Sequence, residues 1–516
     1  MPTLFMKLPH EDKVLRPDAL RELKLGDQTV GFTLEVGLNY YRGLPLSAVE
    51  EFEITVDGEP VPAARMLVEF NEKLFMPEQL KLAWTEFWGI KRDLRVRVYG
   101  DGLAEGDHDV AVRLTLRNVY MQFGPGAYGM VDGSATRTLT LQKSPTNVIP
   151  AQAWIPSTSS TPVIPAQARI PSTSSTPVIP AQAGIPSTKL GKIQPAVSLY
   201  GFEQRLVDVP EYGIEDMFAE LNELGIDSYE LIGSMVFDQY PRPKASEIAA
   251  VLAANEKYGV HANSYGGYID LGKITGHDAT DADIMLDITA DLMTARDLGA
   301  KFLRAGAIPL HLMADAAAMA ERYGVRIGIE VHAPSKPSDE KIQKMLAVMD
   351  ELDSPFLGFI PDFGCFIERP AQPALDRHIA NGAKPELLDY VIANRHAGLD
   401  EAGMQARIAE MGGGEAEKWA ISEMFGFLSF GPADIEGFKT LLHRTQYFHS
   451  KFYHVTADLQ DPQIPVARLL AAIVESGFEG VLLSEYEGHA FHLDDAHEQL
   501  ERHLRLEQKI LSELIS

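Results

Sequence analysis

The stretch RIGIEVH, residues 326–332, decides how the second half of this sequence folds, because an apolar, β-branched run ends there in polar residues. Three later stretches have the same form: GFIPDFG (358–364), KFYHVTADL (451–459) and GVLLSEYEG (480–488). Such runs predict short buried strands. Each strand would carry one potential metal ligand at its C-terminal end: Glu330, Asp362, His454 and Glu485. In a parallel α/β barrel these ends open onto one face, which holds the active site.

Two glutamates, one aspartate and one histidine make an oxygen-rich ligand set with a single imidazole. This set suits Mn²⁺, Mg²⁺ or Co²⁺ better than a structural zinc ion, which prefers thiolates and imidazoles. A single acidic residue at a strand end is commonly just polar rim. Four ligands of metal-binding type on consecutive strands indicate one divalent-metal site.

Strands alternate with helices from about residue 193 to the end of the chain at residue 516. Besides the four strands above, four earlier runs read as strands: AVSLYGF (196–202), SYELIGS (228–234), VHANSYGGYI (260–269) and KFLRAGAI (301–308). Eight strand–helix units are the count of a (β/α)₈ barrel, closed by right-handed crossovers. A doubly wound open sheet is the alternative, but no GxGxxG turn follows a strand.

One connection in the predicted barrel is unusually long. Asp362 and His454 lie roughly 90 positions apart, whereas the neighbouring ligands are separated by roughly 30. The intervening segment, about 367–449, has the periodicity of amphipathic helices. We expect it to project from the active-site face as a lid or a pocket wall.

Residues 1–143 predict an all-β domain, because β-branched and polar residues alternate in short runs separated by turn residues. Asp57-Gly58 is a strong hairpin signal. The spacing favours a β-sandwich. His10 and His108 stand alone in the sequence, and we expect both at the surface. The glycine-rich loop 122–133 either reaches toward a neighbouring active site or is a plain flexible loop.

Residues 144–192 contain a repeat of 15 residues, with VIPAQA starting at Val148, Val163 and Val178. Proline recurs too often for helix or inner strand, and the Ser/Thr clusters offer no core. We expect an extended or disordered linker between the two regions.

The composition limits the classes of partner and location. The net charge is −27, from 73 acidic and 46 basic residues, which argues against nucleic acid and anionic membranes as partners. The single cysteine, Cys365, allows no intrachain disulfide. Neither a membrane-spanning apolar run nor a signal-peptide pattern is evident, so a cytoplasmic location is the expectation.

The residues from about Gln194 to Ser516 resemble the xylose isomerase-like barrels of sugar isomerases and epimerases. The words IGIEVHAPSKP (327–337) and SEYEGH (484–489) look like the α subunit of C-glycoside deglycosidases. The stretch LNYYRGLPLSAVEEFEITVDGEPV (38–61) looks like their small β subunit. Those enzymes usually consist of two separate chains, whereas here both parts are fused. The resemblance implies one divalent metal, commonly manganese, held by Glu330, Asp362, His454 and Glu485.

The resemblance also implies cleavage of 3-oxo-glycosides. A 3-oxo group acidifies the sugar C2 proton, and removing that proton lets the aglycone leave C1 by elimination. The reaction needs a metal near the ketone, a base at C2 and an acid at the aglycone carbon. A metal-dependent sugar isomerase or epimerase needs the first two as well, and is the alternative. A non-catalytic carbohydrate-binding protein is a third possibility, which the intact ligand set disfavours.

We expect His332 to be the base, because residues i and i+2 share one face of a strand and His332 follows Glu330 by two. A hydrogen-bonded structural histidine is the alternative. His332 and the two ligands Glu330 and Glu485 form the predicted catalytic set. Further candidates are expected to bind substrate, each with a structural role as the alternative: His261, Glu230, Arg304 and Glu487. The predicted partners are a sugar or aryl glycoside and further copies of the chain, bound through contacts of the β-rich domain and the barrel.

Overall fold

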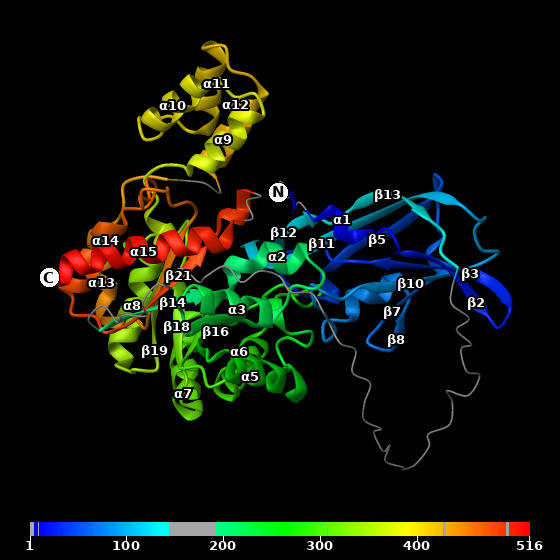
Figure 1. The fold of residues 1–516 in the computed structure, drawn as a ribbon, viewed down its shortest axis with the longest axis horizontal. Coiled ribbons are helices and arrows are strands. Elements are labelled where there is room, and N and C mark those ends of the chain that lie inside the picture. The colour runs from blue at the N-terminus through cyan, green and yellow to red at the C-terminus, as the bar shows by residue number, and fades with distance from the viewer. Residues whose placement is uncertain (1–4, 9, 144–191, 307, 427–429, 492–494) are drawn as a thin grey trace, which may run out of the picture.

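The computed structural model describes residues 5–8, 10–143, 192–306, 308–426, 430–491 and 495–516. The linker expected over residues 144–192 lies outside the described residues except for Lys192. Figure 1 shows the N-terminal strands and the C-terminal barrel side by side.

The N-terminal region consists of two main sheets whose neighbouring strands are antiparallel, apart from the parallel pair β1–β12. The first sheet has the order β1 (Phe5–Lys7), β12 (Ala127–Asp132), β11 (Asp107–Gly124), β5 (Val49–Val56), β6 (Glu59–Pro60), with β13 (Ala135–Thr140) also paired to β11. The second has the order β2 (Leu20–Leu25), β3 (Gln28–Val36), β10 (Leu94–Tyr99), β7 (Met66–Phe70), β8 (Lys73–Phe75). A short separate pair is β4 (Leu44–Pro45) with β9 (Phe87–Trp88).

The two sheets share one core, as the alternation along their strands predicts. In β11, Val110 and Val112 are buried while Arg113 between Val112 and Leu114 is exposed. Leu34 of β3 and Val96 of β10 belong to the same core cluster. The predicted β-sandwich is therefore confirmed.

The predicted hairpin turn is also present. Asp57 and Gly58 join β5 to β6 with φ values of 52° and 82°. A two-residue turn with positive φ at both positions is the type whose twist matches that of antiparallel strands, and it favours Asp-Gly.

The C-terminal region is a nearly closed barrel of parallel strands, as predicted. The order around the sheet is β19 (Leu357–Pro361), β18 (Arg326–Val331), β17 (Phe302–Ala305), β16 (His261–Gly266), β15 (Ser228–Ile232), β14 (Ile193–Ser198), β21 (Gly480–Tyr486), β20 (Phe448–Phe452). Isolated parallel bridges join Phe359 to Thr445 and Asp362 to His449, at the seam between β19 and β20. These bridges bring the two edge strands together.

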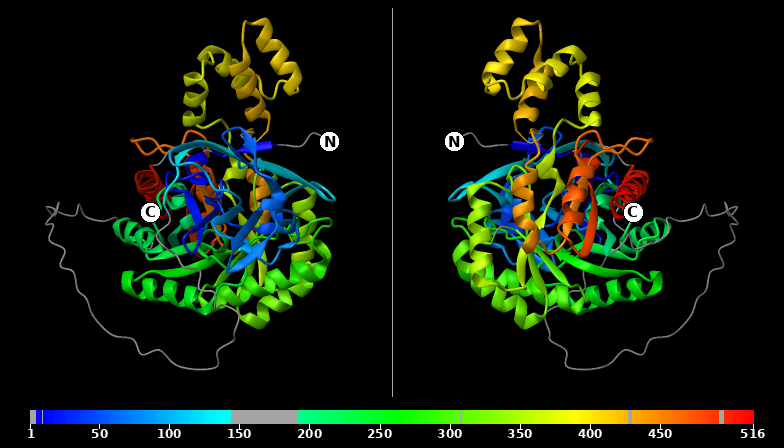
Figure 2. Two further views of the ribbon diagram at one scale, coloured as in Figure 1. Left: turned by 90° about the vertical axis from the view of Figure 1, so that its right-hand side faces the viewer. Right: turned by 90° about the vertical axis from the view of Figure 1, so that its left-hand side faces the viewer.

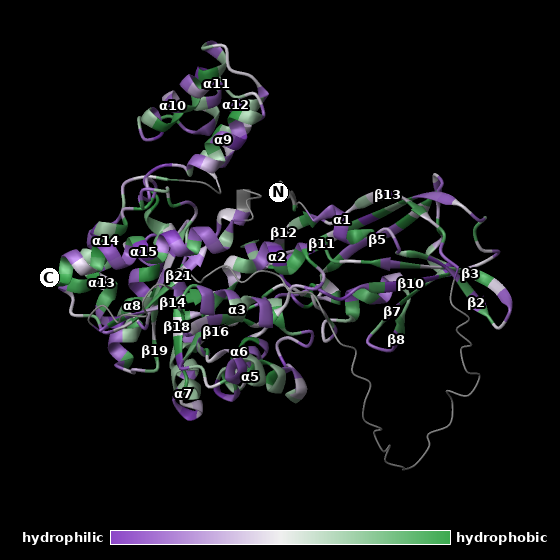
Figure 3. Cartoon of the chain, in the orientation of Figure 1, coloured by the Kyte–Doolittle hydropathy of each residue, from purple (hydrophilic) through white to green (hydrophobic). Residues whose placement is uncertain are grey.

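Helices surround the barrel because each carries one apolar stripe that packs inward. In α14 the stripe is Val466, Leu469, Leu470 and Ile473, all buried. Figure 3 shows this separation of hydrophobic and hydrophilic residues along the chain. The helices outside the long insert are α1 (Glu11–Val14), α2 (Glu203–Asp208), α3 (Ile214–Glu223), α4 (Gly233–Val236), α5 (Ala245–Tyr258), α6 (Asp281–Asp297), α7 (Met313–Tyr323), α8 (Glu340–Leu352), α14 (Val466–Glu475) and α15 (Ala496–Ile515). Among the described residues, none of the helices is both long and apolar enough to cross a membrane.

The long insert is helical, as expected, but its parts lie in different places. The helices α9 (Gln372–Ala380), α10 (Pro385–Asn394), α11 (Glu401–Glu410) and α12 (Glu415–Phe425) project from the barrel and share their own core cluster. Figure 2 shows the same projection from two further sides. The last insert helix, α13 (Ile435–Leu441), instead contacts α14. The insert ends before Phe448, so the expected bound of 449 was too late, because His449 belongs to β20.

The β-rich domain docks on the segment that follows β16 in the barrel. Gly272 donates a backbone hydrogen bond to Val119 (2.7 Å), and the Ser47 hydroxyl donates to the carbonyl of Lys273. The Tyr128 hydroxyl donates to Asp278 (2.5 Å). Tyr128 lies in the glycine-rich segment 122–133, which is therefore part of a strand hairpin that contacts the barrel.

Candidate metal centre

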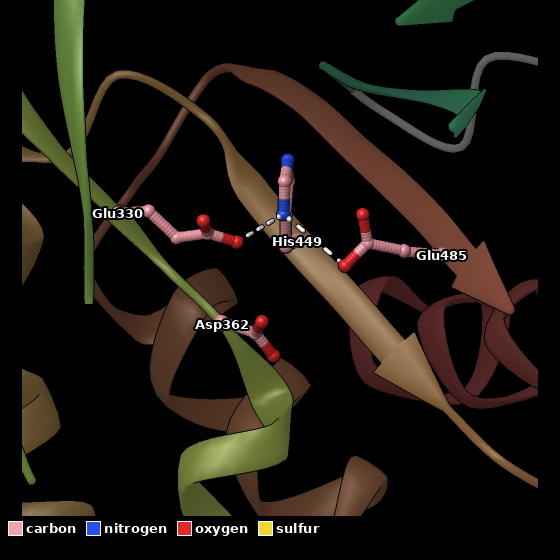
Figure 4. A group of neighbouring side chains, drawn as sticks. All are labelled: Glu330, Asp362, His449 and Glu485. Atoms are coloured by element: carbon pink, nitrogen blue, oxygen red, sulfur yellow. Dashed lines mark hydrogen bonds and ion pairs between the residues drawn. The ribbon is translucent and has the colours of Figure 1, made fainter. Parts of the chain in front are cut away.

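Four potential ligands converge in the barrel, and three of them lie at or just beyond the C-terminal ends of their strands. Glu330, Asp362, His449 and Glu485 each offer one ligand atom, and these atoms lie within 4.8 Å of one another. Figure 4 shows the three carboxylates around the imidazole. Glu330 comes from β18, His449 from β20 and Glu485 from β21, whereas Asp362 directly follows β19. Three of the four predicted ligands are thus brought together.

The fourth predicted ligand, His454, is not in this group, and His449 is there instead. The strand β20 ends at Phe452, so His454 lies beyond it, with Nδ1 3.3 Å from the side-chain nitrogen of Gln499. His449 faces the site because it forms the parallel bridge with Asp362. The sequence did contain a signal: His449 and Lys451 are two positions apart, on one face of the strand FHSKF.

The imidazole of His449 is held at both nitrogens. Nδ1 lies 2.9 Å from Glu330 and 3.4 Å from Glu485, while Nε2 lies 3.3 Å from Glu230. His449 and Glu230 are completely buried. Carboxylate partners fix the orientation of a histidine that binds a metal and make it a stronger ligand.

Lys451 is a site residue that the sequence analysis missed. It pairs with Glu485 in the sheet register, and its side chain is 3% exposed. Its ammonium nitrogen lies close to four potential partners: Asp362 (2.8 Å), Glu485 (3.3 Å), Glu487 (3.2 Å) and the Nε2 of His332 (2.9 Å). Lys451 therefore links the ligand group to His332, the predicted base, and to Glu487, which was predicted to bind substrate.

The charges of the group stabilise one another. Burial alone would raise the pKa of Glu485, but His449 and Lys451 outweigh it and lower that pKa. Burial opposes ionisation of Glu330 too, but Arg304 and His449 hold its pKa well below the usual range. Burial would lower the pKa of His449, whereas the carboxylates of Glu485 and Glu230 raise it well above its ordinary value. Glu330 and Glu485 are therefore held ionised by their positive neighbours, as carboxylate ligands of a cation must be.

The donor set fits a divalent cation. Carboxylate oxygens with one imidazole are typical ligands of Mn²⁺ and of similar ions. Asp362 Oδ2 is buried and makes no hydrogen bond within the described residues, although the Lys451 ammonium lies near it. This oxygen is therefore held by an ion pair, and a metal ion in the group would share it with Lys451.

The remaining predicted residues divide into two groups. His332 and Glu487 adjoin the site through Lys451. Half of the His332 side chain is exposed, and its Nε2 lies 3.8 Å from Asp362. Arg304 and Glu230 instead pair with each other (3.4 Å) beneath the site, and Arg304 also donates to Glu330 (2.9 Å). The alternative of an internal ion pair, which the sequence left open for Arg304, is the one observed.

His261 was expected to line the pocket, and the structure contradicts this. It is the first residue of β16 and is exposed. The metal ligands lie at the opposite, C-terminal ends of the parallel strands, so His261 is at the wrong end of the barrel. The apolar run around it did not show where the strand begins.

A second buried group of titratable side chains lies where the N-terminal domain meets α2. His10 lies 2.7 Å from Asp208, and its other nitrogen lies 3.9 Å from Glu203. His489 lies 3.5 Å from Glu203. Burial, assisted by Asp208, raises the pKa of Glu203 to about 8. The expected surface position of His10 was therefore wrong, and so was that of His108, which is buried against Asp57 (2.7 Å).

Comparison with known families places both halves of the chain. The xylose isomerase-like TIM barrel family matches residues 218–509, which is more than half of the chain. This defines a barrel of an enzyme superfamily. The C-glycoside deglycosidase beta subunit family matches residues 10–120.

Curated relatives match the two halves separately. The 3'-dehydrocarminate deglycosidase alpha subunit of Microbacterium sp is 25% identical over 62% of this chain and 95% of its own length. The beta subunit of the same name and source is 33% identical over 18% of this chain and 69% of its own length. The C-glycoside deglycosidase beta subunit of Arthrobacter globiformis is 32% identical over 19% of this chain and 76% of its own length. The chain belongs to the C-glycoside deglycosidase family, as a β-subunit domain fused to a xylose isomerase-like barrel.

The ligand assignment predicts that His449→Ala abolishes tight metal binding whereas His454→Ala does not. Partners of metal ligands already contribute about 10–100-fold to affinity, so loss of a ligand should cost more than roughly 100-fold. Calorimetric titration of the two variants with Mn²⁺ measures this. Near-normal affinity in His449→Ala, or a large loss in His454→Ala, would contradict the assignment.

The raised pKa of Glu203 predicts a pH-dependent change in stability. Between pH 4.5 and about 8 the folded chain keeps a proton that the unfolded chain releases, so this group lowers stability as the pH rises. The side chain of Glu203→Gln cannot ionise. Its free energy of unfolding should therefore rise relative to that of wild type by on the order of 2–4 kcal/mol when the pH changes from 5 to 8.5.

Denaturant unfolding at the two pH values measures the difference. Glu211→Gln is the matched control, because Glu211 is exposed on the following segment. An equal effect of Glu203→Gln at both pH values would show that Glu203 ionises normally in the folded chain.

Proposed function

We propose that this chain cleaves C-glycosides whose sugar carries a 3-oxo group, in a reaction that depends on a divalent metal. The observation that carries the proposal is the docking of a β-subunit domain next to the carboxylate–histidine group of the barrel, within one chain. Relatives named for a 3'-dehydro compound support an oxidised sugar as the substrate. Names that contain "alpha subunit" and "beta subunit" support the assembly of both parts, and further copies of the chain are expected to associate.

The reaction balances as an elimination. A base takes the proton from C2, which the neighbouring 3-oxo group acidifies. The electron pair left at C2 forms the C1–C2 double bond while the bond from C1 to the aglycone carbon breaks. The pair of that bond stays on the aglycone carbon, which takes up a proton. No oxidant or water is consumed in these steps.

Different residues of the chain would bind the metal and transfer the proton. Glu330, Asp362, His449 and Glu485 would hold the metal. The bound ion, most simply Mn²⁺ with Mg²⁺ or Co²⁺ as alternatives, supplies Lewis-acid polarisation of the 3-oxo group. His332 lies at the edge of the group, half exposed, with Nδ1 2.6 Å from the carbonyl of Ala333 and Nε2 toward Lys451. This exposure leaves the ring open to substrate, and Lys451 would have to release Nε2 for that nitrogen to take the C2 proton.

The proposal predicts release of aglycone from a 3-oxo-C-glucoside by the full-length, Mn²⁺-loaded protein. The unoxidised C-glucoside should stay intact, because its C2 proton is not acidic. Chromatography of the free aglycone measures both. A protein that leaves the 3-oxo-C-glucoside intact but isomerises or epimerises a free ketohexose would instead carry the alternative sugar isomerase activity.

The role of His332 predicts a loss of turnover without a loss of metal. A general base contributes about 10²–10⁴-fold, so His332→Ala should lower kcat by that range while metal content stays near wild type. His261→Ala is the control, since His261 is exposed at the opposite end of the barrel. Near-normal kcat in His332→Ala would move the base to another residue beside the group, with Glu487 next.

A further inference from the structure

We propose that Arg42 of the β-rich domain is a positioning residue for the metal centre: through the ring of Tyr268 it holds Arg304, and Arg304 holds the ligand Glu330. This inference rests on the proposed metal site but not on the proposed reaction. It gives the N-terminal domain a task at the barrel without contact between that domain and the metal.

The first link is the set of contacts that Arg42 makes with the segment after β16. Its guanidinium is completely buried and donates to both oxygens of Asp270, at 2.6 and 3.3 Å. The same guanidinium lies over the ring of Tyr268, 4.1 Å from its centre, and over that of Tyr120, 5.2 Å away. A buried cation needs such partners to offset the loss of water. Arg42 therefore fixes this segment at two points, Tyr268 and Asp270.

The second link runs from Tyr268 to Arg304. The guanidinium of Arg304 lies over the same ring, 5.4 Å from its centre. The backbone nitrogen of Gly267 also donates to the carbonyl of Arg304 (2.9 Å). A Cβ on Gly266 would lie 2.8 Å from an Arg304 nitrogen, so the glycine leaves room for the guanidinium. Three consecutive residues of the segment YGGY (265–268) therefore contact Arg304, namely Gly266, Gly267 and Tyr268.

The third link runs from Arg304 to the ligand. Its Nη1 donates to Oε2 of Glu330 (2.9 Å), while Oε1 of Glu330 faces His449 (2.9 Å). One carboxylate oxygen is thereby occupied by Arg304, and the other is directed to the ligand group. Without a fixed Arg304, rotation of the Glu330 carboxylate would compete with this arrangement, and the ligand would be less preorganised.

The sign of the effect separates positioning from plain electrostatics. Loss of a nearby positive charge would by itself strengthen the binding of a cation. Positioning predicts the reverse. A variant that disturbs Tyr268 or Arg42 leaves Arg304 paired with Glu230 and Glu330 but removes the ring contact that limits its orientation. Tyr268→Leu is the clearest variant, since it removes the ring without any change of charge.

The test is calorimetric titration of the full-length protein with Mn²⁺, which needs no turnover. Tyr268→Leu should weaken Mn²⁺ binding roughly threefold to thirtyfold, the range of such indirect coupling. Tyr268→Phe keeps the ring and should stay within about twofold of wild type by the same reasoning. Arg42→Lys keeps the charge but loses the planar fork, and should weaken Mn²⁺ binding in the same direction as Tyr268→Leu.

A matched control removes a different contact between the two domains. Lys91 donates to the carbonyls of Val209 (2.9 Å) and Pro210 (3.0 Å), in the segment after α2, away from Tyr268. Lys91→Ala should leave Mn²⁺ affinity unchanged. If it weakens affinity as much as Arg42→Lys, docking in general is responsible and the proposal is overturned.

Two further results would overturn it. One is wild-type affinity in both Tyr268→Leu and Arg42→Lys. The other is an equal loss in Tyr268→Phe and Tyr268→Leu, which would assign the effect to the hydroxyl. If Tyr268→Leu does not fold, the comparison of Arg42→Lys with Lys91→Ala decides. Because aglycone release is not measured, failure of the proposed reaction leaves this test intact.

Discussion

Buried negative charge at the C-terminal ends of the barrel strands is the constraint on which the rest of this structure depends. Glu230, Asp362 and Glu485 are buried, and Glu330 is largely so, with 13% of its side chain exposed. Each such carboxylate costs several kcal/mol unless cations and donors compensate. Arg304 and Lys451 supply two of these cations. A divalent ion among the four ligands would supply the largest compensating charge.

The fold and three of the four ligands could be predicted from the sequence because they depend on local patterns. Glu330 and Glu485 each come one residue before a strand ends, and Asp362 comes one residue after one. In all three stretches the apolar run stops at the ligand, so the ligand's place along the strand is visible in the sequence.

The histidine ligand could not be placed in this way. The apolar residues of FYHV continue past Phe452, but hydrogen bonding to β21 ends there, so His454 falls outside the sheet. Strand limits and register depend on the neighbouring strand, which a local pattern does not contain. The same reason explains His261: its strand begins at that residue, and the sequence did not show which end it occupied. Lys451 was missed because its partners come from three other segments.

The fusion of the two parts gives the interface a different task from that of a free subunit. A buried ion pair such as Arg42–Asp270 contributes little net affinity, because desolvation offsets much of its attraction. It does fix orientation, since its geometry is specific. A covalent connection raises the effective concentration of the partner domain to about millimolar without any new contact. The covalent connection then keeps the two domains close together. The interface contacts are therefore not needed for affinity, and they can instead orient Tyr268, Arg304 and Glu330.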